Sequence, residues 1–165
     1  MDLIVLISWN SYFSTMASAS ATLTGLLFVA VSINLTRILE IRGLAGRAVE
    51  SLMQLFGVLA MATTFLIPGL HMHTLGILVL GIALLVWALQ GYVQGKYFAM
   101  RTGSPLHWIL SRVVQTQLAC IPLLVSGVLL LYGYPVALYW AAAGSILSLA
   151  AGIANAWVLL VEILR

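Results

Sequence analysis

Apolar residues fill five long stretches of the chain, and short segments rich in glycine, proline or charge separate them. A membrane-spanning helix needs about 20 apolar residues to cross a hydrocarbon core about 30 Å thick. Each stretch meets that length, and backbone groups in lipid must be hydrogen-bonded internally, so each stretch is predicted to be a helix. The predicted spans are residues 11–39, 46–67, 74–100, 105–131 and 136–164.

The connections between these stretches are short, and short connections favour antiparallel neighbours. Pro68 and Gly69 form a strong helix-breaking pair after the second span, and Pro135 suits the first position of the fifth. The pattern predicts an all-α, polytopic transmembrane fold, a single bundle of five antiparallel helices. Residues 1–165 are expected to form one transmembrane domain with no soluble domain.

Positive charge is confined to alternate connections. The seven cationic residues flank the first and third connections or end the chain: Arg37, Arg42, Arg47, Lys96, Arg101, Arg112 and Arg165. The N-terminal segment and the second and fourth connections carry no lysine or arginine. Because cytoplasmic loops are enriched in these residues, the N-terminus is predicted to lie outside and the C-terminus in the cytoplasm.

The composition agrees with a membrane location. The chain is 63% hydrophobic and 7% charged, whereas soluble domains carry about 25% charged residues. The net charge of +3 comes from cations dispersed at helix ends, so the sequence offers no basic patch for nucleic acid. Membrane lipid is the expected surrounding, and no nucleic-acid partner is expected.

Residues 21–39, from Ala21 to Leu39, form a helix rich in small and hydroxylated residues, and 44–50 follow it as Leu-Ala-Gly-Arg-Ala-Val-Glu. Together, residues 21–50 resemble the first helix of a family of small uncharacterised bacterial inner-membrane proteins. The resemblance covers this part of the chain, and no known activity is attached to it. It implies a multi-pass protein of the bacterial inner (cytoplasmic) membrane.

Two helices carry seams of small residues. In the first span, Ser18, Thr22 and Gly25 belong to a heptad-spaced row of small or hydroxylated side chains. In the fifth span the corresponding residues are Gly144, Ser148 and Gly152. Small residues let helices approach closely in lipid, so both rows are candidate packing seams. A hydroxylated wall of a pore is the alternative interpretation of the first row.

Amide and acidic side chains gather in the half of the membrane predicted to face the cytoplasm. They are Gln54, Gln90, Gln115, Asn155, Glu50 and Glu162. The amides are expected to lie roughly 10–15 Å below the inner surface, at 1.5 Å of rise per residue. Unpaired polar groups are costly in hydrocarbon, so these side chains should face each other or water. They predict either hydrogen bonds that join the helices or a polar vestibule open to the cytoplasm.

The sequence offers little chemistry. It lacks the motifs of metalloproteases, serine hydrolases and phosphate-binding loops, so no catalytic residue is named and the chain is not expected to be an enzyme. His71, Met72 and His73 make an incomplete set of metal ligands, and Cys120 is expected to be a small buried hydrophobe. No metal or other cofactor is predicted.

Two functions follow from these patterns. The first is a small integral membrane protein that acts through helix–helix association, as a homo-oligomer or as an accessory, assembly or regulatory subunit of a larger membrane complex. The alternative is a channel or carrier that uses the cytoplasm-facing polar vestibule. The first rests on the packing seams, and the second on the amide side chains.

Overall fold

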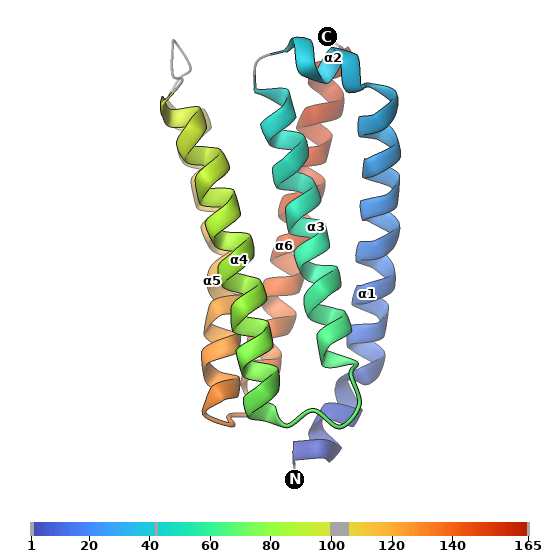
Figure 1. Ribbon diagram of the computed structural model, residues 1–165, viewed down its shortest axis with the longest axis vertical. Helices are drawn as coiled ribbons and strands as arrows, with labels where there is room; N and C mark the ends of the chain where they lie inside the picture. The colour runs from blue at the N-terminus through green and yellow to red at the C-terminus, as the bar shows by residue number, and fades with distance from the viewer. Residues whose placement is uncertain (1, 42, 100–105, 165) are drawn as a thin grey trace.

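A computed structural model describes residues 2–41, 43–99 and 106–164 of the chain, with side chains at 8–41, 43–96 and 110–162. Almost all of this part of the chain is helical, and it contains no strand (Figure 1). The helices are α1 (Asp2–Ile33), α2 (Leu35–Glu40), α3 (Leu44–Phe65), α4 (Met72–Ala99), α5 (Leu106–Leu131) and α6 (Ala137–Leu164). Five of them are long and apolar enough to cross a membrane, so the helical class and the number of long apolar helices are as predicted.

The first predicted span, 11–39, is divided in two. The helix α1 ends at Ile33, and the short helix α2 lies across the upper end of the molecule in the view of Figure 1. At the junction, the side-chain nitrogen of Asn34 donates a hydrogen bond to the carbonyl of Ala30 at 2.8 Å. Asparagine side chains compete in this way with the backbone for hydrogen bonds, which favours a helix end. Ile38 is buried, so α2 is packed onto the bundle.

The other spans begin and end within one or two residues of the predicted positions. Gly133 has a φ of 74°, a left-handed conformation that suits glycine, in the turn that separates α5 from α6. Arg42, Arg101, Arg165 and the connection between the third and fourth predicted spans lie outside the described residues.

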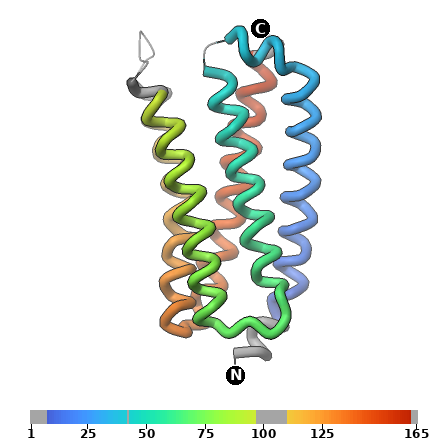
Figure 2. The backbone as a smooth tube through the Cα atoms, viewed as in Figure 1, coloured from blue at the N-terminus to red at the C-terminus, as the bar shows by residue number. Residues whose placement is uncertain are grey.

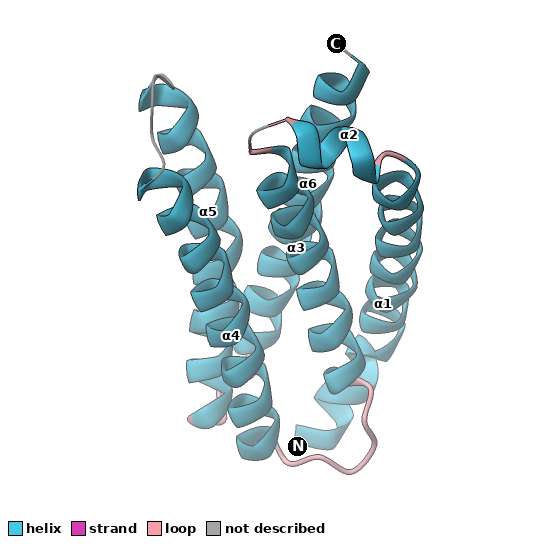
Figure 3. Ribbon diagram, turned by 45° about the horizontal axis from the view of Figure 1, so that its top comes forward, coloured by secondary structure: helices cyan, strands magenta, loops and turns pink. Residues whose placement is uncertain are grey.

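The helix α3 lies in the middle of the molecule. In its most apolar stretch 61% of the residues are buried, whereas the corresponding share for α1 is 17%. It contacts α1 on one side and α4 and α6 on the others, while α5 lies against α4 and α6 (Figures 1 and 3). The backbone turns at the lower end between α3 and α4 and again between α5 and α6 (Figure 2). The helix α1 therefore sits at the periphery and joins the other four mainly through α3.

Apolar packing holds the lower half of the molecule. The rings of Phe13 on α1 and Phe65 on α3 are stacked with their centroids 4.1 Å apart. Nearby, the hydroxyl of Tyr12 donates a hydrogen bond to the carbonyl of Ala142 on α6 at 3.1 Å. These contacts close the lower end of α1 onto the bundle, where a larger apolar cluster includes Met61.

The helices α4 and α5 approach each other most closely in this same half. A β-carbon at Gly76 would lie 2.7 Å from the backbone nitrogen of Leu131, and one at Gly127 would lie 2.8 Å from the α-carbon of Leu80. Both distances are shorter than a real β-carbon tolerates. Each helix thus contributes a glycine that lets the other backbone approach, so α4 and α5 pack closely.

The upper half is held in two different ways. On the side of α1, α2, α3 and α6, an apolar cluster that includes Leu27, Leu55 and Leu159 joins the helices. On the side of α4 and α5, hydrogen bonds and an ion pair also join these helices to α3 and α6. Gln54, Gln90 and Gln115 lie in this second region.

Candidate functional site

The polar site begins on α3, where Glu50 and Gln54 lie one helical turn apart on the same face. Each is 2% exposed. Residues four apart share a helix face because the α-helix has 3.6 residues per turn. The helix thus directs a carboxylate toward α5 and an amide toward α4.

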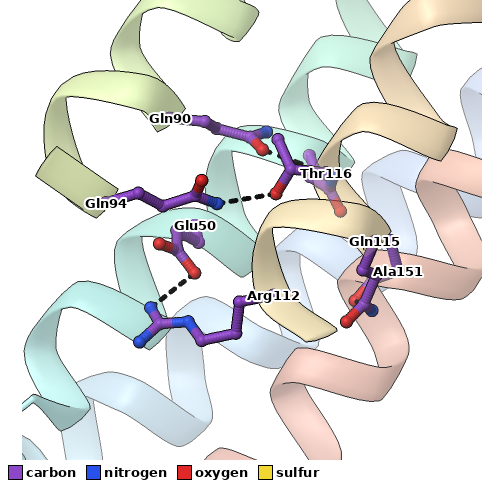
Figure 4. A network of polar contacts seen from close by, with 8 residues as sticks. Glu50, Gln90, Gln94, Arg112, Gln115, Thr116 and Ala151 are labelled. Carbon is purple, nitrogen blue, oxygen red and sulfur yellow. Dashed lines mark hydrogen bonds and ion pairs between the residues drawn. The ribbon is translucent and has the colours of Figure 1, made fainter. Parts of the chain in front are cut away.

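An ion pair joins α3 to α5 in this region. A terminal nitrogen of Arg112 donates to Oε2 of Glu50 at 2.6 Å (Figure 4). The Glu50 side chain is 2% exposed and that of Arg112 is 13% exposed. Removing one partner of such a buried pair leaves an uncompensated charge, which typically costs about 3–5 kcal/mol. The pair therefore ties the upper part of α5 to α3.

Amide side chains connect the same helices to α4. The side-chain nitrogen of Gln54 donates to the side-chain oxygen of Gln90 on α4 at 3.5 Å, a long hydrogen bond. One turn further along α4, the nitrogen of Gln94 donates to the hydroxyl of Thr116 on α5 at 2.7 Å. All four side chains are buried. The polar contacts thus link α3 to α4 and α4 to α5.

The polar contacts between α5 and α6 go to backbone oxygens. The side-chain nitrogen of Gln115 donates to the carbonyl of Ala151 at 3.0 Å. The hydroxyl of Ser148 donates to the carbonyl of Ala119 at 3.4 Å. Gln115 is thus turned toward α6, away from the amides of α3 and α4.

The structure brings together three of the six predicted polar residues, Glu50, Gln54 and Gln90. Asn155 is buried on α6, one turn beyond Ala151, and Glu162 is half-buried near the upper end of that helix. Neither is hydrogen-bonded to Gln54, Gln90 or Gln115 within the part of the chain that is described. The predicted set is therefore divided. Glu50, Gln54 and Gln90 belong to a polar cluster between α3, α4 and α5, whereas Gln115 faces α6 and Asn155 and Glu162 lie on α6.

Three members of the cluster were not in the predicted set: Arg112, Gln94 and Thr116. Their positions carried a signal, since Gln94 is one turn from Gln90 and Thr116 is one turn from Arg112. Pairs at this spacing share a helix face. The sequence did not show that the two faces meet.

Two seams of small residues have different surroundings. A β-carbon at Gly144 would lie 3.1 Å from the backbone nitrogen of Leu123 on α5, and one at Gly152 would lie 2.9 Å from the side chain of Leu55 on α3. With Ser148 bonded to α5, the α6 seam is filled within the chain.

The α1 seam faces away from the rest of the chain. Ser18, Thr22 and Gly25 are exposed, and no atom of another helix lies within 4 Å of a β-carbon at Gly25. The hydroxyl of Ser18 donates to the carbonyl of Ser14 at 3.0 Å, and that of Thr22 donates to the carbonyl of Ser18 at 2.9 Å. These hydroxyls are thus satisfied within α1, and the face they share is open.

No cluster of three or more histidine, cysteine, aspartate or glutamate side chains capable of holding a metal occurs in the described part of the chain. His71 and His73 are exposed near the start of α4, while Met72 between them is buried. The two histidine side chains thus face outward while the methionine side chain between them faces inward. Cys120 is buried, and it lines a small cavity near Gln54 and Gln90.

Comparisons with protein-family models, with curated proteins and with solved structures found no match for the chain.

Proposed function

We propose that this chain is a small multi-pass protein of a bacterial inner membrane that acts through helix–helix association. It forms a homo-oligomer or serves as an accessory, assembly or regulatory subunit of a larger membrane complex. In this proposal the long helices are five antiparallel spans, with the N-terminus outside and the C-terminus in the cytoplasm. The distribution of lysine and arginine supports that orientation.

One observation carries the proposal: the α1 seam packs against no other helix in the described part of the chain. Gly25 has open space where a β-carbon would stand, while Gly144 and Gly152 on α6 are covered by neighbouring helices. Apolar burial does not drive association in lipid, so helices associate through close packing at small residues. The exposed face of α1 has the composition that permits such packing and lies on the least buried of the five spans.

Cysteine cross-linking in native membranes tests the proposal. In a Cys120→Ala background, Thr22→Cys should form cross-linked species, because it places a thiol on the α1 seam. Leu85→Cys is the matched control, since Leu85 is 60% exposed on α4, away from α1. Equal cross-linking of the two variants, or none at Thr22→Cys, would argue against association through this face.

A channel or carrier is the second candidate function, and one observation favours it. Oε1 of Glu50, Oε1 of Gln54 and Nε2 of Gln90 are buried with no hydrogen-bond partner among the described residues. Groups of this kind are expensive in a membrane and commonly mark a path for ions or polar solutes. Proteoliposome flux that is unchanged by Gln54→Leu and Gln90→Leu would exclude this candidate.

A further inference from the structure

A small, partly open cavity lies where α3, α4, α5 and α6 converge. Its lining includes Gln54 from α3, Gln90 from α4, Cys120 from α5 and Ser148 from α6. The rest of its wall is apolar, with Val58 among the residues. The cavity offers about 10 Å³ to the centre of a water molecule. A buried water needs about 10–15 Å³ by this measure, so the space fits one water and nothing larger.

Two polar atoms of the residues that line this cavity lack a partner. Gln54 and Gln90 share one long hydrogen bond of 3.5 Å, which leaves Oε1 of Gln54 and Nε2 of Gln90 unpaired among the described residues. Gln54 is 2% exposed and Gln90 is 0% exposed, so bulk solvent does not satisfy them. Burying an amide group without a hydrogen bond is unfavourable, because the group loses its bonds to water and gains none in return.

The orientation of the two amides does not change this conclusion. The oxygen and nitrogen of a glutamine side chain are assigned from their hydrogen bonds. If both amides were turned over, Gln90 would donate to Gln54, and the remaining pair would again be one donor and one acceptor. A water molecule complements such a pair, because it accepts from the nitrogen and donates to the oxygen. The hydroxyl of Ser148, whose hydrogen is given to Ala119, retains lone pairs for the second hydrogen of the water.

We propose that the cavity binds one water molecule, which bridges Gln54 and Gln90 and completes a hydrated polar layer between the four helices. Buried waters typically make about two to four hydrogen bonds to otherwise unsatisfied groups, and the unpaired amide atoms of Gln54 and Gln90 supply two of them. The proposal is independent of association through α1, because the cavity lies inside one chain.

An experimental structure of the wild-type protein, at a resolution that shows ordered water, tests the proposal. We expect one density peak within hydrogen-bonding distance of an amide atom of Gln54 and an amide atom of Gln90. Two amides rotated into a direct pair of hydrogen bonds, or a cavity without density, would overturn it. The same measurement on Gln90→Leu should show loss of the peak, because the donor is gone. A peak that persists in that variant at the same place would also contradict the bridging role.

Discussion

Arg112 on α5 donates a hydrogen bond of 2.6 Å to Glu50 on α3, and this ion pair joins two residues that are 62 positions apart in the chain. Toward the other end of these helices, α4 and α5 are held together by glycine contacts and apolar packing. Near the ion pair, hydrogen bonds also join α4 to α3 and α5 to α6. The ion pair therefore gives α5 a direct, charged connection to α3.

Replacing Arg112 with Met should destabilise the protein by about 3–5 kcal/mol, because it leaves a buried carboxylate without its counter-ion. Thermal unfolding in mild detergent measures the effect. The double variant Glu50→Met/Arg112→Met should recover most of the loss, since no uncompensated charge remains. A double variant that is no more stable than the single one would contradict this account of the pair.

Arg37 and Glu40 supply the control for that experiment. Their atoms are 3.7 Å apart, and the two side chains are 52% and 60% exposed. Exposed pairs contribute about 0–1 kcal/mol. Arg37→Met should therefore leave the unfolding temperature almost unchanged, and a loss as large as that of Arg112→Met would show that burial does not decide the effect.

Gly144→Leu should destabilise the protein, because its side chain would occupy space filled by Leu123. Overpacking of this kind typically costs about 1–3 kcal/mol. Leu160→Ile is the control on the same helix, since Leu160 is 38% exposed and an isomeric side chain changes little. The two variants are compared by unfolding in detergent. Equal, negligible effects would show that the α6 seam has no importance for packing.

The proposed topology predicts the behaviour of reporter fusions. A reporter that is active only in the cytoplasm should give a signal when it is fused after Arg165. A reporter that is active only outside the cytoplasm should give a signal when it is fused before Met1. The reason is that lysine and arginine flank the first and third connections and are absent from the second and fourth. An external signal from the C-terminal fusion would contradict the orientation.

The long helices were predictable because a run of apolar residues determines whether a segment can span a membrane. The break at Asn34 was not, because it depends on whether one side chain bonds the backbone at Ala30 instead of pointing elsewhere. An asparagine side chain can do either, and the residues on both sides of Asn34 form one continuous, largely apolar stretch in the sequence.

The candidate site was predictable only in part. Spacing placed Glu50 and Gln54 on one face, but the rotation of α3 about its axis decides which helix that face meets. The same limit separates the two seams: Gly25 and Gly144 lie in similar patterns, yet one is open and the other is covered. In lipid, a small residue marks where a helix can be approached closely. It does not say which helix approaches.

The oligomeric mass of the purified protein tests the central claim, association through α1, most directly. The wild-type chain in lipid nanodiscs should have the mass of an oligomer or of a complex with a partner. Gly25→Leu should release the monomer, because a leucine side chain would separate helices that pack at the glycine. It should not lower the unfolding temperature of the monomer, since no described residue of another helix lies beside Gly25. A monomeric wild-type protein, or a Gly25→Leu variant with the wild-type mass, would contradict the account.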